Sequence, residues 1–275
     1  MPELPEVETT IRGLQPIVNS TILSIKIHTP KLRFFIPKNI LRKQESVEIK
    51  EIKRRGKLIL LNLSNEHTIV MHLGMSGRLR LINNNKFQKQ RHDHFILRTN
   101  QDHCLIFNDV RKFGFIDCGK IEEIYNKKYM VSLGEEALGI NLNDKYLFLK
   151  ISKSAVAIKQ ILLDQSIIAG IGNIYASEIL FNAKISPLLR GKDLSLEECN
   201  QLILSTKKIL KKAISAGGST LRDYVSTDGT VGNYQSNFKV YKKDGQKISG
   251  KIIKKIVQYG RSTYFCPDLQ KKQKI

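Results

Sequence analysis

Apolar and polar positions follow two different periods along the chain. Residues 3–18 place Val7, Ile11, Leu14 and Val18 three or four positions apart, which is the spacing of one helical face. From residue 22 to about 118, short apolar runs rich in β-branched and aromatic side chains alternate with polar turns, a pattern typical of a β-sandwich or flattened barrel. The predicted strands are residues 22–28, 58–63, 68–73, 95–98, 104–108 and 113–118.

After about residue 130 the pattern becomes helical. Helices are predicted over residues 145–149, 155–163, 174–181 and 196–216, and the last one carries a long apolar stripe. Gly217 and Gly218 end that helix, and the polar stretch that follows is of the kind that closes over ligands. The fold class is therefore α+β multidomain, with a β-sandwich domain at 1–125, a helical domain at 130–225 and a basic β-hairpin at 238–272.

The charge points to a polyanion as partner. The chain has 46 Lys+Arg against 25 Asp+Glu, a net charge of +21. Nucleic acid is the leading candidate because each neutralised phosphate releases a counterion, while a basic surface without a dedicated ligand is the alternative. A membrane partner is not indicated, and the N-terminus does not resemble a secretory signal, so we expect a cytoplasmic protein. The four widely spaced cysteines argue against a disulfide framework.

The N-terminus carries a candidate nucleophile. If Met1 is removed, Pro2 becomes a secondary amine with a pKa near about 8, so more of it is neutral at pH 7 than of a lysine. Its attack on a carbonyl carbon would give an electron-withdrawing iminium ion, and Glu3 beside it could act as a general acid. The alternative is a proline that merely favours the first turn of a helix.

The segment PELPEVETTIRGL resembles the N-terminal signature of the formamidopyrimidine-DNA glycosylase family. Further motifs follow in the order and spacing of that family, so the resemblance covers essentially the whole chain; they are KRRGKLI (53–59), HLGMSGRL (72–79), HDH (92–94), NDVRKFG (108–114), GIGNIYASEILF (170–181), GGSTLRDY (217–224) and GRSTYFCP (260–267). The resemblance implies a monomeric, bifunctional glycosylase and AP lyase of base excision repair. Such an enzyme removes oxidised purines from double-stranded DNA and cleaves the strand by β,δ-elimination.

The resemblance also implies a catalytic set. Pro2 would be the Schiff-base nucleophile at the sugar C1′, and Glu3 the acid that opens the deoxyribose. Glu6 would organise this carboxylate site. Lys57 would supply the β-elimination proton and a phosphate contact, and Arg261 would grip the phosphates around the lesion and assist δ-elimination.

Other matching residues would hold the DNA open. Met75, Arg111 and Phe113 would fill the space left by the extruded nucleotide, and Arg111 would reach the orphaned base, which is cytosine by analogy with the family. For Met75 and Phe113, core packing is the alternative. His92 matches a DNA contact, whereas His94 could be either a contact or structural.

The motif at 170–181 matches the helix-two-turn-helix feature of the family. Gly170 and Gly172 allow a tight turn, and we expect Asn173 to cap the next helix with its amide facing a phosphate. Lys153 and Lys159 would reach neighbouring phosphates. The loop at 217–234 aligns with a lid over the flipped base and includes Ser219, Thr220, Arg222 and Tyr224.

The C-terminus departs from the family, which has a zinc finger of the form CxxC, sixteen residues, CxxC. The four ligand positions are here Gln246, Ser249, Cys266 and Leu269. A structural zinc ion needs four N or S donors, so no zinc and no other cofactor is expected. The hairpin would be held, more loosely than with a metal, by apolar contacts from Phe238, Val240, Ile252, Ile256 and Phe265.

Two alternatives remain open at this stage. One is an endonuclease VIII-like glycosylase for oxidised pyrimidines, although the PELPEVE start and the pair Arg111 and Phe113 favour purines. The other is a DNA-binding relative that is catalytically weakened along with its zinc finger. It is disfavoured by the presence of the proposed catalytic residues, which are Pro2, Glu3, Lys57 and Arg261.

Overall fold

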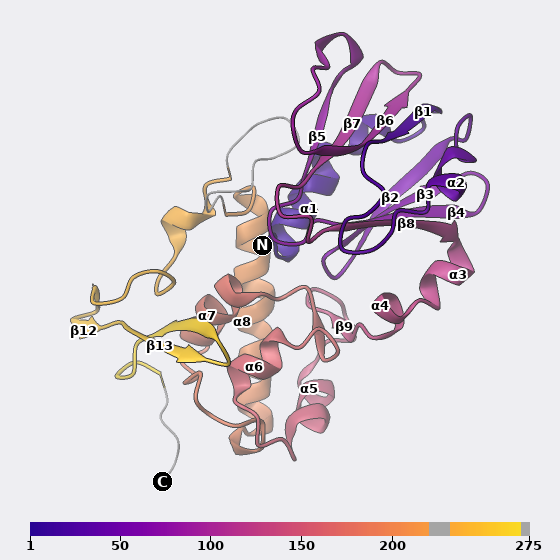
Figure 1. Cartoon of the computed structure of the whole chain (residues 1–275). Coiled ribbons are helices and arrows are strands. Elements are labelled where there is room, and N and C mark those ends of the chain that lie inside the picture. Colours follow the sequence, from indigo (N-terminus) through magenta and orange to yellow (C-terminus); the bar gives the residue numbers. More distant parts are fainter. Residues whose placement is uncertain (220–231, 271–275) are drawn as a thin grey trace. The chain divides into compact units, whose positions relative to one another are not determined.

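The computed structural model describes residues 1–219 and 232–270. The chain divides into two compact units, one of Met1–Val131 with Ala216–Gln235 and the other of Ser132–Ser215 with Ser236–Ile275 (Figure 1). The chain therefore leaves the first unit after Val131 and returns to it for residues 216–235.

The first unit contains the predicted β-sandwich, made of two four-stranded antiparallel sheets. One sheet has the order β1-β6-β7-β5 and the other β2-β3-β4-β8. The strands are β1 Ile22–Ile27, β2 Ile49–Arg55, β3 Leu58–Leu63, β4 His67–His72, β5 Arg78–Asn83, β6 Asp93–Thr99, β7 His103–Asn108 and β8 Phe115–Lys120. The helices are α1 Leu4–Gly13, α2 Lys38–Arg42, α3 Ile121–Tyr125 and α4 Lys128–Val131, with 3-10 turns at Gln15–Ile17 and Asn84–Lys86.

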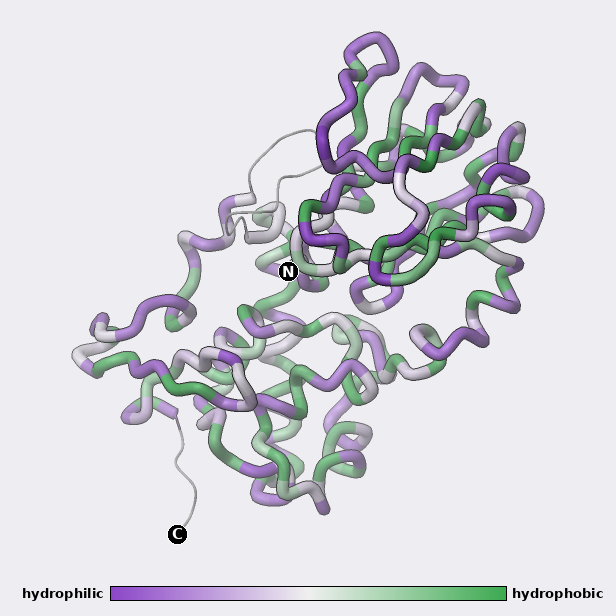
Figure 2. Tube along the Cα trace, viewed as in Figure 1, coloured by the Kyte–Doolittle hydropathy of each residue, from purple (hydrophilic) through white to green (hydrophobic). Residues whose placement is uncertain are grey.

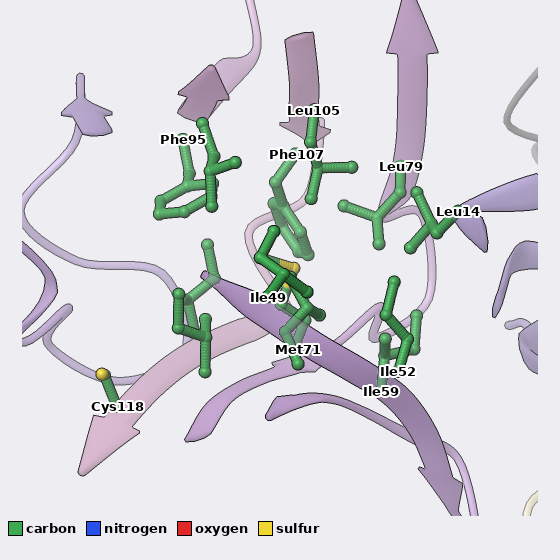
Figure 3. Packing of buried hydrophobic residues seen from close by; sticks show 14 of the residues in the cluster. Leu14, Ile49, Ile52, Ile59, Met71, Leu79, Phe95, Leu105, Phe107 and Cys118 are labelled. Carbon is green, nitrogen blue, oxygen red and sulfur yellow. The ribbon is translucent and has the colours of Figure 1, made fainter. Parts of the chain in front are cut away.

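The core of this unit lies between the two sheets. Phe95 and Phe107 from one sheet meet Ile59 and Met71 from the other (Figure 3). Strand β3 is buried along its whole length, and α1 adds its apolar face to the same cluster. The loop between β5 and β6 is mostly hydrophilic (Figure 2). Burial of both inner faces thus supplies the main stabilisation of the sandwich.

The sequence pattern did not predict β2 or β5. In β2 the pairing register shifts between Ile49 and Glu51, so the buried residues Ile49 and Ile52 are three positions apart and the period of two is broken. In β5, arginines alternate with apolar residues. The guanidinium of Arg80 is accommodated because it lies 2.9 Å from the buried carboxylate of Asp93.

Two predicted helices are shorter in the structure. Helix α1 ends at Gly13, and a 3-10 turn that contains Pro16 follows it, because proline cannot donate the next helical hydrogen bond. Helix α6 begins at Ile158 rather than at 155. The preceding residue, Ala157, is extended and forms a β-bridge with Arg190.

The second unit is built on helices. They are α5 Asp144–Ile151, α6 Ile158–Leu163, α7 Asn173–Asn182 and α8 Leu196–Ser215, with short strands β9 Glu135–Glu136 and β10 Ile168–Ala169 and 3-10 turns at Gly191–Asp193 and Tyr234–Asn237, the last spanning the boundary between the units. Helix α7 is buried along most of its length and contacts α6, α8 and β14. Among the helices of the described residues, none combines the length and apolar character needed to cross a bilayer.

The C-terminal segment folds as small hairpins in the second unit. Its strands are β11 Lys247–Ile248, β12 Lys251–Ile252, β13 Lys254–Gln258 and β14 Arg261–Phe265. Phe238, Val240 and Phe265 are buried as expected and Ile256 is half-buried. The expectation for Ile252 is wrong: its side chain is 48% exposed, and Ile253, between the two hairpins, points into the cluster instead.

All four cysteines are free, in agreement with the prediction that they form no disulfide framework, and all four are buried. Burial raises the pKa of the Cys118 and Cys199 thiols to about 12, and it also raises that of Cys104. Cys266 lies in the apolar cluster of the C-terminal segment.

Candidate functional site

Two buried carboxylates lie at the start of α1. Glu3 and Glu6 are each only 2% exposed, and Pro2 before them is also buried. One carboxylate oxygen of Glu6 accepts a hydrogen bond of 2.9 Å from the backbone N–H of Glu3. The other oxygen accepts bonds from the backbone N–H of Ser219 (2.7 Å) and from its hydroxyl (2.9 Å). Glu6 thus fixes the backbone of Glu3 and joins it to the GGST motif.

Backbone hydrogen bonds next to Ser219 join residues 216–218 to residues 233–234. The N–H of Asn233 donates to the carbonyl of Ala216 (3.1 Å), and the N–H of Tyr234 donates to that of Gly218 (3.0 Å). Gly218 has φ +76°, and a Cβ there would lie 3.1 Å from a carboxylate oxygen of Glu6, so only glycine fits. Ser219 is therefore positioned at the predicted loop. Thr220, Arg222 and Tyr224 lie outside the described residues.

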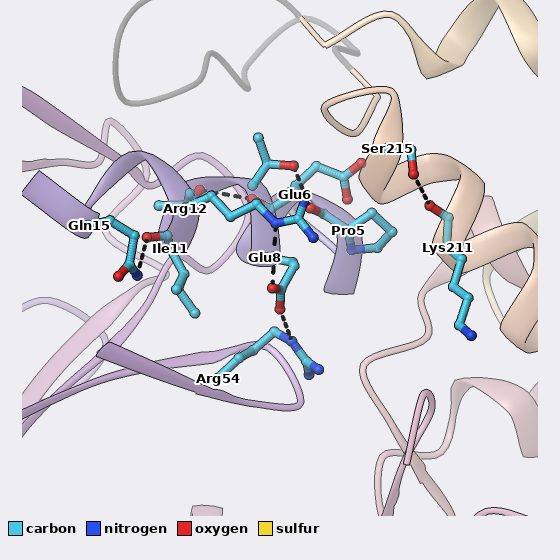
Figure 4. Close-up of polar contacts among 11 residues, drawn as sticks. Pro5, Glu6, Glu8, Ile11, Arg12, Gln15, Arg54, Lys211 and Ser215 are labelled. Carbon is cyan, nitrogen blue, oxygen red and sulfur yellow. Dashed lines mark hydrogen bonds and ion pairs between the residues drawn. The ribbon is translucent and has the colours of Figure 1, made fainter. Parts of the chain in front are cut away.

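Lys57 lies in the turn between β2 and β3 and is 8% exposed. Its neighbour Arg54 donates to Glu8 of α1 at 2.9 Å, and Glu8 also pairs with Arg12 at 3.8 Å (Figure 4). This ion pair joins the end of β2 to α1. The basic turn is therefore a packed part of the fold.

Nothing in the sequence assigned a separate role to His72, which lies at the end of β4, although the motif at 72–79 contains it. Its ring stacks on Phe115, with centroids 5.4 Å apart, and its Nδ1 accepts a 3.1 Å bond from the N–H of Gly74. Burial, and then the nearby positive charges of Lys57 and Arg33, lower the pKa of His72 to about 4. The imidazole is therefore neutral near pH 7, which suits its role as acceptor.

This pKa shift predicts a pH dependence of stability. Because folding lowers the pKa of His72 from 6.5 to about 4, the unfolded chain takes up a proton there at higher pH than the folded protein does. The resulting stabilisation is complete above pH about 6.5 and is lost as the pH falls toward 4. Urea unfolding between pH 7 and pH 4.5 should lose about 2 kcal/mol less in His72→Gln than in the wild type. An identical pH slope in both proteins would contradict the assignment.

Met75, Arg111 and Phe113 lie on two exposed turns of the first unit, Met75 between β4 and β5 and the other two between β7 and β8. Met75 is 40% and Phe113 is 45% exposed, so the alternative of core packing is wrong for both. The guanidinium of Arg111 lies over the Phe113 ring, 4.6 Å from its centroid. The turns therefore present apolar and cationic surface together.

The two histidines of the HDH motif have different surroundings. His94 is 5% exposed, and its Nε2 lies 2.9 Å from the backbone oxygen of Asp109. It is therefore structural. His92 is half-buried, with its ring centroid 6.4 Å from that of His94, and keeps part of its surface available to a ligand.

Lys159 and Asn173 form a buried polar network in the second unit. Lys159 is 1% exposed, and its ammonium donates to the Asn173 side chain (2.8 Å), the Ser262 carbonyl (3.0 Å) and the Thr263 hydroxyl (2.6 Å). The ammonium therefore bonds to protein groups, and its contact with a phosphate stays a prediction. The expectation that Asn173 caps the helix is wrong, because Gly172 holds that position and the Asn173 amide donates to Ser262 (3.0 Å).

The network has a consequence for Arg261. Arg261 begins β14 and is exposed, and Ser262 next to it is held by both Lys159 and Asn173. The buried pair therefore fixes the backbone from which Arg261 extends. Lys153, two residues after α5, is exposed and makes its charge available to a ligand.

The four positions of the family zinc ligands do not suit a metal. Gln246 and Ser249 are exposed, Cys266 is buried in an apolar cluster and Leu269, which has no donor atom, packs against that cluster. Within 1–219 and 232–270, no group of three or more His, Cys, Asp or Glu side chains could hold a metal ion.

Polar anchors hold this C-terminal segment in the second unit. The carboxylate of Glu178 on α7 accepts backbone bonds from Lys239, Val240 and Tyr241 at 2.8–2.9 Å, and burial raises its pKa. Gln270 accepts from the Cys266 N–H and donates to the carbonyl of Ile185, both at 2.7 Å.

Comparisons with known proteins agree with this arrangement. Residues 1–116 match the formamidopyrimidine-DNA glycosylase N-terminal domain, and residues 133–225 match the H2TH domain of the same enzymes. A formamidopyrimidine-DNA glycosylase from Zymomonas mobilis is 42% identical over 273 residues, which are 98% of this chain and all of the relative. A Lactococcus lactis FPG mutant in complex with Fapy-dG-containing DNA has a TM-score of 0.90 at 36% identity, covering 98% of this chain and 100% of that one.

A second solved structure extends the comparison. Wild-type Lactococcus lactis Fpg in complex with DNA that contains an oxidised pyrimidine has a TM-score of 0.88 at 36% identity, with the same coverage. The fold, the site and these matches place the chain in one class of enzyme, the DNA glycosylases of base excision repair. The chain belongs to the formamidopyrimidine-DNA glycosylase family, whose members are glycosylases and AP lyases.

Proposed function

We propose that this enzyme acts as a cytoplasmic monomer on double-stranded DNA, removes oxidised purines such as 8-oxoguanine and formamidopyrimidines, and then cleaves the strand by β,δ-elimination. The observation that carries the proposal is the pair of buried carboxylates, Glu3 and Glu6, beside Pro2 at the start of α1. The Lactococcus lactis complex with Fapy-dG-containing DNA supports the choice of lesion.

The chemistry begins once Met1 has been removed. The nitrogen of Pro2 forms a bond to C1′ of the damaged nucleotide as the bond from C1′ to the nucleobase breaks. The departing nucleobase keeps the bonding electron pair and takes up the proton that the amine loses, and Glu3 protonates the sugar ring oxygen as the ring opens. The product is an iminium ion, which acidifies the C2′ proton. A proton-accepting group removes that proton and the 3′-phosphate leaves. A second elimination then expels the 5′-phosphate. Lys57 would serve the first elimination and Arg261 the second.

The remaining residues would hold the opened duplex. Extruding a nucleotide costs a few kcal/mol of stacking and pairing, and exposed Met75 and Phe113 would recover part of this by filling the gap. Arg111 would contact the orphaned base, and His92 and Lys153 would contact phosphates. Asn173 and Lys159 would act by positioning the chain next to Arg261.

Borohydride trapping tests the proposed function. The pure protein is incubated with duplex that carries 8-oxoguanine opposite cytosine, or an oxidised pyrimidine, and borohydride reduces any iminium to a stable cross-link. Efficient trapping on the purine supports the proposal. Trapping on the pyrimidine alone supports the endonuclease VIII-like alternative. Binding without trapping indicates a catalytically weakened relative.

We also propose that the C-terminal segment folds without zinc. The cluster of Val240, Ile253 and Cys266, with the anchors Glu178 and Gln270, supports this because it joins the hairpins to helix α7 through contacts that need no metal. Elemental analysis should find far less than one zinc per chain. Incubation with EDTA should change neither the thermal midpoint nor DNA binding. Near-stoichiometric zinc, or a large loss of stability with EDTA, would contradict this.

A further inference from the structure

Asp109, which follows strand β7, is a buried carboxylate that none of the steps above uses. It is 0% exposed. One carboxylate oxygen accepts a 2.6 Å bond from the hydroxyl of Ser76, and the other accepts a 2.8 Å bond from the backbone N–H of Gly114. The carboxylate therefore bonds to both exposed turns, the one that carries Met75 and the one that carries Arg111 and Phe113.

Ser76 closes the network from the other side. Its hydroxyl accepts a 3.2 Å bond from the backbone N–H of Arg111, which also lies 3.2 Å from the carboxylate of Asp109. The single proton of the hydroxyl goes to Asp109, so its lone pair is available to Arg111. A bond to a charged acceptor in a buried setting is among the stronger hydrogen bonds in proteins.

The backbones of the two turns also touch. A Cβ on Gly74, whose φ is +63°, would lie 2.4 Å from the nitrogen of Gly114, and a Cβ on Gly114 would lie 2.6 Å from the carbonyl oxygen of His72. The backbone of Asp109 is fixed as well, because its N–H donates to the carbonyl of His92 at 3.1 Å. The turns therefore have no room to slide past each other.

We propose that Asp109 and Ser76, which we name the Asp109–Ser76 clamp, are positioning residues that make the two turns enter the DNA as one rigid wedge. The inference rests on the proposed function, since it assumes that Met75, Arg111 and Phe113 fill the gap. Met75 comes from one turn and Arg111 and Phe113 from the other. These three side chains can occupy the single gap in the DNA only if their relative geometry is set before insertion. The clamp sets it without touching the DNA.

Ser76→Ala tests the clamp, because it removes one hydroxyl and leaves the fold intact, and Ser76→Thr, which retains the hydroxyl, is the matched control. The first readout is the fluorescence of 2-aminopurine placed opposite a tetrahydrofuran abasic analogue in duplex DNA, which reports insertion without any catalysis. We expect Ser76→Ala to slow insertion roughly 10-fold or more and Ser76→Thr to slow it far less. Asp109→Asn should act in the same direction, since an amide has only one acceptor oxygen and cannot accept from both the Ser76 hydroxyl and the N–H of Gly114.

The second readout separates positioning from general damage. Cleavage of a preformed abasic site in single-stranded DNA needs Pro2 but no wedge, so Ser76→Ala should retain that activity within about twofold while excision from duplex falls with insertion. Unchanged insertion in Ser76→Ala, or an equal loss of both activities, would overturn the clamp. Failure of the wild type to excise 8-oxoguanine would refute the proposed function instead, and the fluorescence assay would still decide on the clamp.

Discussion

Replacing Pro2 with glycine is expected to reduce borohydride trapping on 8-oxoguanine duplex by roughly 10²–10³-fold. The variant keeps a terminal amine, but a primary one without the ring that holds the nitrogen at the start of α1, so the attacking geometry is lost. Single-turnover trapping measures the effect. Affinity for a tetrahydrofuran duplex should change little, because Lys57, Arg111 and Arg261 are untouched.

Two controls make this result decisive. Mass spectrometry of both proteins must show that Met1 has been removed, since an acylated Pro2 has no nucleophilic nitrogen. Glu3→Gln, which keeps the size of the buried side chain and removes its acid, should also lose trapping. Cross-linking of Pro2→Gly at the wild-type rate, whether through its primary terminal amine or through a lysine, would show that the proline nitrogen is not required and would remove the basis of the mechanism.

The second large effect is expected for Gly74→Ala, which should lower the free energy of unfolding by about 3 kcal/mol or more. The added Cβ would meet backbone atoms of Phe113 and Gly114 at 2.4 Å, and φ of +63° is unfavourable for alanine. Gly245→Ala is the matched control: its φ is +77°, but a Cβ there meets nothing within 4 Å, so only about 1 kcal/mol should be lost. Urea unfolding followed by circular dichroism measures both variants. Equal losses would show that backbone strain alone accounts for the effect.

The sequence predicted those parts of the fold that local pattern controls. Strand β3 was predicted to the residue, because six apolar-rich positions between a basic turn and a polar turn leave little choice. The family motifs also indicated the catalytic set that we propose. Strand β2 was missed because a register shift hides its alternation. Ile252 was predicted in place of Ile253 because the buried residue lies between the two hairpins, outside the strand pattern.

Orientation of the polar side chains could not be predicted in the same way. Lys159 and Asn173 have the types and positions of phosphate ligands, but their partners, Ser262 and Thr263, come from a strand about a hundred residues away. Asp109 illustrates the same limit. It stands within a recognised motif, yet its bond to Ser76 depends on how β4, β5, β7 and β8 bring two turns together.

The burial of the four thiols has a consequence for an enzyme that repairs oxidative lesions. Peroxides attack thiolates, so a buried thiol is a poor target, and burial also raises the pKa of Cys104, Cys118 and Cys199. Once Met1 has been removed, Met75 is the exposed methionine of the described residues, whereas Met71 and Met130 are buried. Oxidative damage to the protein should therefore begin at the tip of its own wedge, as a sulfoxide that a reductase can reverse.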